Sequence, residues 1–167
     1  MKILLMLLAL VAAAILQAVF PTWRWTGQAT APILLGVVMY YALSHSRATM
    51  LQAAILAGLL QDALGMIPLG YSSFCFCMVG LGVSKFKDMV FVHELVTHMI
   101  FGGLASGLVT LGLYMLLSKD DLVTLRPAWA FLKITGSLLL GALIVPLECE
   151  VLTSLDRMMG TVGTEEA

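Results

Sequence analysis

Long apolar runs separated by short polar corners are the feature that most constrains this chain. Six such runs cover residues 3–20, 31–43, 48–64, 71–83, 95–117 and 128–147. A backbone inside a lipid bilayer must satisfy its hydrogen bonds internally, so runs of this kind form helices. Only 11% of the 167 residues are charged, which leaves no soluble domain. The sequence therefore predicts an all-α polytopic membrane protein, a single bundle of six transmembrane helices over residues 1–160.

The two ends of the chain have patterns of their own. Lys2 and the Leu/Ala run after it resemble a secretory signal peptide. The run is longer than a usual signal core and no polar domain follows, so we expect it to be a retained first span. Residues 148–159 are amphipathic and either continue the sixth helix or lie along the membrane surface. Residues 161–167 are expected to form a frayed tail.

Basic residues in the polar corners predict the orientation. With six spans both termini lie on one side, and that side has five basic residues against four on the other. The five are Lys2, Arg47, Lys85, Lys87 and Arg157, and the four are Arg24, Lys119, Arg126 and Lys133. This small excess predicts that both termini are cytoplasmic.

The third run has a stripe of small residues that ends in an acid. On a helix Ala54, Gly58 and Asp62 are spaced by four and share one face. Small residues let another backbone approach closely, which points the carboxyl group toward protein instead of lipid. Two interpretations stay open: Asp62 caps or solvates a helix end at the membrane surface, or it has a structural or coupling role inside the bundle.

A glycine and proline corner follows this stripe. Gly65, Pro68 and Gly70 are expected to end the third helix. Proline lacks an amide donor, and glycine tolerates the left-handed backbone that a tight reversal requires.

The fifth run is the richest in glycine. Gly103 and Gly107 form a GxxxG pair, and Gly102 and Ser106 form a parallel pair of small residues. The pattern predicts a closely packed helix without showing whether its partner belongs to the same chain. We take Gly103 and Gly107 as the first candidates for packing against a partner helix.

Few side chains offer chemistry. His93 and His98 are five apart, about 140° around a helix, so with Glu94 they do not match the metal-binding motif of histidines four apart. Cys75 and Cys77 point in different directions on a helix, and with Cys149 they are expected to be buried thiols. His45 is expected to be a solvated loop residue. We therefore expect no catalytic, cofactor or metal site.

The corner after the third run carries a family resemblance. Gly58, Leu59, Leu60 and Asp62 followed by Pro68, Leu69 and Gly70 resemble the bacterial rod shape-determining protein MreD family. The resemblance implies a subunit of the elongation machinery in the bacterial cytoplasmic membrane, acting with MreC, the MreB cytoskeleton, RodA and a class B penicillin-binding protein. It also implies a fold similar to the substrate-binding components of energy-coupling-factor vitamin transporters.

Three functions are therefore compared. The first is a non-catalytic scaffold or regulator of lateral cell-wall peptidoglycan synthesis. The second is a small-molecule-binding subunit of a transporter, which predicts a closed cavity lined by Gln61, Asp62, Tyr71 and Ser72. The third is a membrane protease built on His93, Glu94 and His98, which their helical spacing disfavours.

Overall fold

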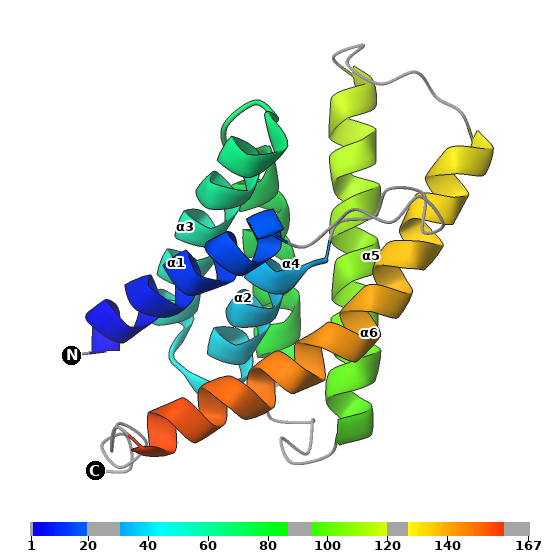
Figure 1. The fold of residues 1–167 in the computed structure, drawn as a ribbon. Helices are drawn as coiled ribbons and strands as arrows, with labels where there is room; N and C mark the ends of the chain where they lie inside the picture. The colour runs from blue at the N-terminus through cyan, green and yellow to red at the C-terminus, as the bar shows by residue number, and fades with distance from the viewer. Residues whose placement is uncertain (1, 20–30, 87–94, 120–126, 159–167) are drawn as a thin grey trace.

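The apolar runs of the sequence form helices along most of their length. The computed structural model describes residues 2–19, 31–86, 95–119 and 127–158. These residues contain six helices, shown in Figure 1: α1 (Lys2–Val19), α2 (Ile33–Ser44), α3 (Arg47–Gly65), α4 (Tyr71–Phe86), α5 (Leu95–Lys119) and α6 (Pro127–Met158). The predicted all-α fold with six helices is confirmed.

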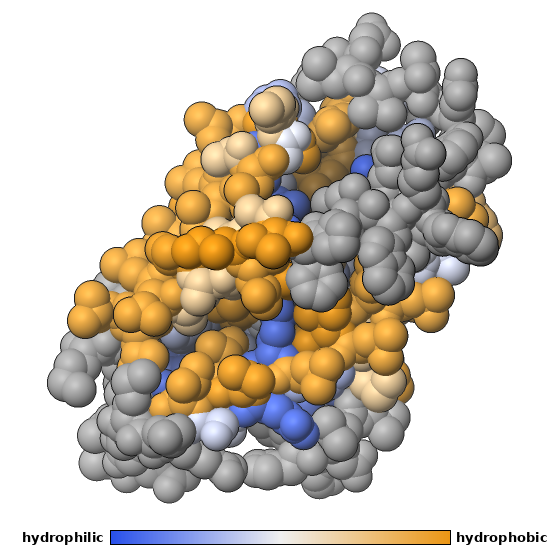
Figure 2. Space-filling view, viewed as in Figure 1, coloured by the Kyte–Doolittle hydropathy of each residue, from blue (hydrophilic) through white to orange (hydrophobic). Residues whose placement is uncertain are grey.

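The helices have the length and surface of a membrane protein. Three stretches within the described residues are long and apolar enough to cross a bilayer: Arg47–Gly65, Thr97–Lys119 and Ala130–Asp156. Leu4–Val19 and Ile33–Ser44 are shorter apolar helices. Apolar side chains cover much of the visible face in Figure 2, and many large ones on α1, α5 and α6 are exposed. The chain is a helical membrane protein, and crossing by each of the six helices stays a prediction.

The shortest helix, α2, lies at the centre of the fold. Every residue from Ile33 to Leu43 is buried, and α2 packs against α1, α3, α4 and α6. A helix that is apolar all round is stable where other helices surround it. The short second run of the sequence is therefore the core of the bundle.

The last two helices cross, as Figure 1 shows, and pack against each other around the crossing point. α6 continues through the buried Pro146 to Met158. Of the two alternatives for residues 148–159, the structure has the continued helix, which also packs against α2.

Some sequence-based predictions concern residues outside the described ranges. These are the tail at 161–167 and three of the basic residues used for the orientation, Arg24, Lys87 and Arg126. The cytoplasmic position of both termini stays a prediction.

Candidate functional site

The carboxyl group of Asp62 joins the end of α3 to the start of α4. Asp62 is fully buried. Its Oδ2 accepts a hydrogen bond from the Gly70 N–H (2.7 Å), and its Oδ1 accepts one from the Ser72 N–H (3.0 Å). The first amides of a helix have no partner within that helix, and an acceptor side chain at this end also interacts favourably with the helix dipole. Asp62 is therefore the N-terminal cap of α4, supplied by the preceding helix from inside the bundle.

The turn between these helices is a left-handed corner. Met66 follows α3 with φ of 50°, and its N–H bonds to the Asp62 carbonyl. Gly70 has φ of 105°, a conformation that favours glycine. The sequence pointed to glycines for this reversal, which is right for Gly70. At the helix end, however, Met66 takes the left-handed position and Gly65 is the last helical residue, whereas Pro68 lies exposed in the turn.

The small residues of α3 bring its backbone against α4. Ala54 and Gly58 are buried as the spacing predicted. A Cβ atom at Gly58 would clash with the backbone N and Cα of Ser73. Ser73 Oγ also donates to the Ile55 carbonyl (3.0 Å), so a hydrogen bond crosses the contact. Gly58 is thus the residue that allows α3 and α4 to meet closely enough for Asp62 to reach the amides of α4.

A second polar contact ties α1 to the same helix. Gln17 Nε2 donates to Gln61 Oε1, and Gln17 Oε1 accepts from the Leu34 N–H (3.1 Å). The side-chain amide of Gln17 therefore joins α1 to α3 and to the first turn of α2. The Leu34 N–H, like the other first amides of a helix, has no acceptor within its own helix. Gln17 was not among the residues predicted from the sequence, although it is a lone polar residue in an apolar run and such residues usually face protein.

The glycines of α5 meet α6 of the same chain. A Cβ atom at Gly102 would lie 2.6 Å from Val145 Cβ, and one at Gly103 would lie 3.1 Å from the Leu138 carbonyl oxygen. Gly107 is less tightly packed, since its Cβ would be 3.7 Å from the Leu138 side chain. The face chosen for a partner helix is therefore covered by α6, and a contact with another protein there stays a prediction.

Hydroxyl groups add hydrogen bonds to this contact between α5 and α6. Ser106 Oγ donates to the Ser137 carbonyl (2.8 Å), and the Ser137 and Thr110 hydroxyls are 2.6 Å apart. A Cβ atom at Gly141 would lie 2.7 Å from the Gly102 carbonyl oxygen. Small residues and hydroxyls together hold the two backbones close, as is typical of helix contacts in lipid.

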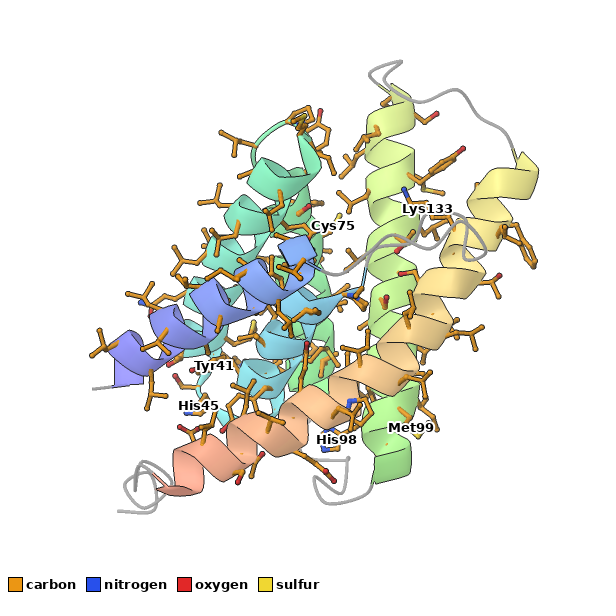
Figure 3. All side chains as sticks on the ribbon, viewed as in Figure 1. Tyr41, His45, Cys75, His98, Met99 and Lys133 are labelled. Atoms are coloured by element: carbon orange, nitrogen blue, oxygen red, sulfur yellow. The ribbon has the colours of Figure 1, made fainter. Side chains whose placement is uncertain are left out.

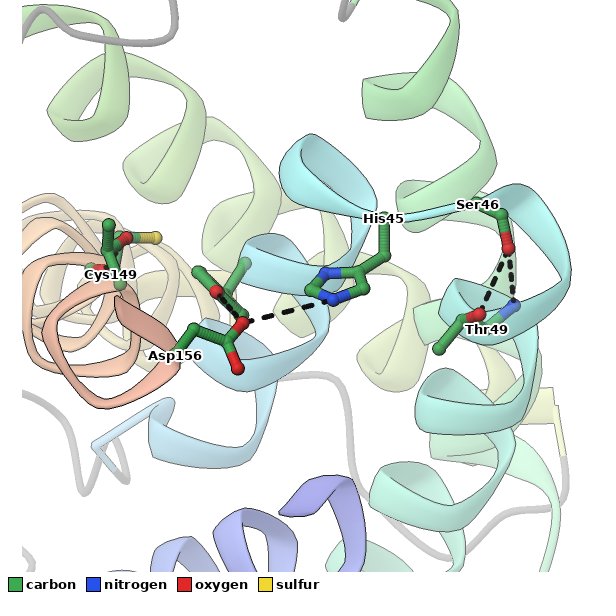
Figure 4. A network of polar contacts seen from close by, with 7 residues as sticks. His45, Ser46, Thr49, Cys149 and Asp156 are labelled. Atoms are coloured by element: carbon green, nitrogen blue, oxygen red, sulfur yellow. Dashed lines mark hydrogen bonds and ion pairs between the residues drawn. The ribbon is translucent and has the colours of Figure 1, made fainter. Parts of the chain in front are cut away.

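A third polar cluster lies where the ends of α2 and α6 meet. Asp156 is 7% exposed and accepts a hydrogen bond from the Tyr40 hydroxyl. His45 Nε2 is 3.9 Å from Asp156 Oδ2, the contact drawn in Figure 4. The His45 ring also packs 4.9 Å from the Tyr41 ring, near which it lies in Figure 3. The expectation of a solvated His45 is wrong because α6 extends past Pro146 and covers the corner after α2.

The remaining candidates from the sequence are two histidines with a glutamate, three cysteines and a predicted ligand cavity. His93 and Glu94 lie outside the described residues, and His98 is half-buried in the first turns of α5. Cys75 and Cys149 are buried free thiols, as expected, and Cys77 is a half-buried one. Among the described residues, one apolar hollow of about 530 Å³ lies between α1, α2 and α6 and another of the same volume between α4 and α5, and Gln61, Asp62, Tyr71 and Ser72 line neither of these two. At the Asp62 corner, both carboxyl oxygens accept hydrogen bonds from backbone amides of the same chain, at Gly70 and Ser72.

Comparison with known proteins gives one family. The family described as rod shape-determining protein MreD matches residues 1–148. No curated protein matches the chain. No solved structure matches it either, so the similarity to energy-coupling-factor transporter components stays a prediction.

Proposed function

Since the chain belongs to the MreD family of rod shape-determining proteins, we propose that it is an integral-membrane subunit of the bacterial elongation complex. In this role it is a non-catalytic scaffold or regulator of lateral cell-wall peptidoglycan synthesis. The observation that carries the proposal is the family match over residues 1–148. The family match supports a role in determining rod shape. The non-catalytic scaffold role is our extension of it.

The buried polar groups support a structural role for the bundle. Both Asp62 oxygens accept hydrogen bonds from backbone amides, one in the turn before α4 and one in its first turn, and Gln17 joins three helices. A catalytic carboxyl group needs an oxygen that substrate or water reaches, in a site where other reactive groups converge. The hydrogen bonds of Asp62 and Gln17 instead fix one helix against another.

The resemblance that suggested the function also suggests the partners. We expect the protein in the bacterial cytoplasmic membrane with both termini in the cytoplasm. We expect it to bind MreC, with RodA, a class B penicillin-binding protein and the MreB cytoskeleton in the same machinery. Exposed apolar side chains on the helices are available to lipid and to the helices of such partners.

Recovery of partners from membranes tests this function. The tagged full-length protein is purified from a rod-shaped bacterium in mild detergent, and the proteins recovered with it are identified by mass spectrometry. We expect MreC among them, enriched over a tagged membrane protein of unrelated function. Recovery of transporter ATPase subunits in place of MreC would favour the transporter alternative.

Substitutions at two glycines locate the contact. Gly103→Ile is expected to weaken recovery of MreC if a partner uses the Gly103 and Gly107 face. Because Gly103 packs on α6, the thermal stability of the purified variant is measured in parallel. Gly82→Ile is the matched control, since a Cβ atom at Gly82 has nothing within 4 Å. Unchanged recovery with Gly103→Ile removes this face as the docking site.

A further inference from the structure

The corner between α3 and α4 has an apolar outer surface. Met66 and Leu69 at its tip are 96% and 72% exposed, and Leu64 and Phe74 on the flanking helices are exposed as well. Residues 63–70 include no side chain that is charged or forms hydrogen bonds. An exposed apolar patch of this kind marks a contact with protein or with lipid. The function proposed above makes no use of this surface.

The basic ends of this helix pair lie away from the corner. Arg47 begins α3 and Lys85 lies in the last turn of α4, and both side chains are exposed. The two helices run in opposite directions from the corner that joins them (Figure 1), so both basic groups lie at its far end. Between them, residues 48–84 have one charged side chain, the fully buried Asp62. Lysine and arginine at helix ends reach the headgroups, which places this basic end at one membrane surface.

The lengths of the two helices place the corner near the other membrane surface. α3 has 19 residues and α4 has 16. At 1.5 Å per residue they are about 28 and 24 Å long, whereas the hydrocarbon core of a bilayer is about 30 Å thick. A tilt of the helices shortens this reach further. Tyr71, the first residue of α4, is of a type that is enriched at the membrane interface. The corner therefore ends at the inner edge of the opposite headgroups and not far out in water.

The backbone of the corner finds its acceptors within the chain. The carbonyl oxygen of Asp62 accepts hydrogen bonds from the N–H groups of Met66 and Ile67. The carboxyl oxygens of the same residue accept from the Gly70 and Ser72 N–H groups. Water satisfies the amides of an ordinary exposed turn, but amides that face lipid need acceptors in the protein. One residue thus supplies four hydrogen bonds that make this turn compatible with surroundings poor in water.

We propose that the α3–α4 corner lies in the membrane, at the boundary between headgroups and acyl chains of the leaflet opposite Arg47 and Lys85. Met66 and Leu69 contact the acyl chains there, and the backbone of residues 66–70 lies at the level of the headgroups. The depth follows from the helix lengths. The absence of charged and polar side chains at 63–70 matches lipid and gives a water-phase partner nothing to bind through hydrogen bonds. This position is independent of the partners proposed above.

Spin labels at the tip test the proposal. The full-length protein with Met66→Cys or Leu69→Cys is labelled with a nitroxide in detergent and reconstituted alone in vesicles of phosphatidylethanolamine and phosphatidylglycerol. Oxygen concentrates among acyl chains, whereas the neutral chelate nickel ethylenediamine diacetate concentrates in water. Relaxation of the label by each reagent is measured by electron paramagnetic resonance. We expect relaxation by oxygen to exceed relaxation by nickel at both positions.

Two further positions on the same part of the chain calibrate the measurement. Ile55→Cys, an exposed position halfway along α3, is the reference for acyl chains. Ser44→Cys, an exposed position in the polar corner between α2 and α3, is the reference for water. The ratio of oxygen to nickel relaxation at Met66 and Leu69 is expected to be several times that at Ser44. The unmodified protein, labelled in the same way, gives the background from its native cysteines.

Two results would overturn the proposal. Relaxation by nickel that exceeds relaxation by oxygen at both tip positions, as at Ser44, would place the corner in water. Weak relaxation by both reagents would show that protein covers the tip, and since the protein is reconstituted alone, this would be a second copy. Met66 and Leu69 are largely exposed, so replacing them is expected to leave the fold intact. Thermal unfolding of each labelled variant, compared with that of the unmodified protein, checks this.

Discussion

Asp62 shows how one acid is accommodated inside an apolar bundle. It has no exposed surface, and the amides of Gly70 and Ser72 donate to its two oxygens. An unpaired buried carboxyl group would cost several kcal/mol, so these two bonds make the position tolerable. In return, the start of α4 gains a cap, which typically contributes about 0.5–2 kcal/mol. The residue and the corner therefore depend on each other.

Gly58 is expected to be needed for the close packing of α3 against α4. Gly58→Ala adds a Cβ atom that clashes with the backbone of Ser73, so α3 and α4 must move apart. We expect a loss of about 1–3 kcal/mol, the usual cost of overpacking, measured by thermal unfolding in detergent. Gly82→Ala is the matched control in a helix, because a Cβ atom there meets open space. It is expected to be neutral or stabilising by up to about 1 kcal/mol. Equal effects of the two substitutions would contradict close packing at Gly58.

The contact between α5 and α6 shows how two whole helices are held together in lipid. Lipid gives helices no hydrophobic reason to associate, so close van der Waals contact and hydrogen bonds must hold them. The glycines of α5 allow that contact, and the hydroxyls of Ser106, Thr110 and Ser137 add hydrogen bonds across it. The free energy of packing α5 against α6 therefore depends on how closely each glycine lets the two backbones approach.

Three single glycine-to-alanine substitutions on α5 measure how closely α6 packs at each position. Gly102→Ala is expected to be the most destabilising, by about 2–3 kcal/mol, because its Cβ atom would approach Val145 and the Gly141 carbonyl oxygen. Gly103→Ala is expected to cost less, since only small shifts at Leu138 and Ala142 are needed. Gly107→Ala meets Leu138 at ordinary contact distance and is expected to be tolerated. Thermal unfolding of the three variants in detergent gives the order, and a different order would contradict this contact.

Much of this arrangement could be predicted from the sequence. The apolar runs predicted the six helices, and the spacing of Ala54, Gly58 and Asp62 predicted a buried face with an inward acid. These predictions succeed because helix geometry alone decides which residues share a face. The Pro68 and Gly70 corner follows from local backbone chemistry in the same way.

The rest depends on contacts between distant segments. In lipid an apolar residue suits both the core and the surface, so hydropathy gave no sign that α2 is central. Asp156 belonged to an amphipathic stretch and His45 to a polar corner. Their contact follows only from the path of α6 across α2. Glu148 lies against Gly36, and its buried carboxyl oxygens accept no hydrogen bond from a described residue; this position could likewise be found only once the helices were placed.

At the scale of the whole molecule, buried polar groups join elements that lipid alone would not hold together. Asp62 joins α3 to α4, Gln17 joins α1 to α2 and α3, and Asp156 joins α6 to α2. Five of the six helices are linked by these three residues, and the Ser106 and Ser137 hydroxyls link α5 to α6. The scaffold role proposed above requires such a bundle, because a rigid bundle has fixed surfaces.

Cells whose only copy of the protein carries a substitution at Asp62 test whether the bundle needs this buried acid. In a rod-shaped bacterium that has Asp62→Leu as its only copy, we expect rounded cells and a reduced amount of the protein in membranes. The reason is that the bundle loses the cap of α4. Glu150→Leu replaces an exposed acid and is the matched control, expected to keep rod shape. Shape and membrane abundance are measured together by microscopy and immunoblotting. Rods with a normal amount of the Asp62→Leu protein would contradict a structural need for this acid.

Backbone hydrogen exchange of the purified protein tests whether Asp62 holds the start of α4 against α3. Exchange is followed by mass spectrometry in peptides that cover residues 66–74, for the unmodified protein and for Asp62→Leu. We expect the Gly70 and Ser72 amides to be protected in the unmodified protein and to exchange much faster in the variant, because their acceptor is removed. Peptides from the contact between α5 and α6 are expected to stay unchanged. Equal exchange of residues 66–74 in both proteins would show that Asp62 does not hold this corner.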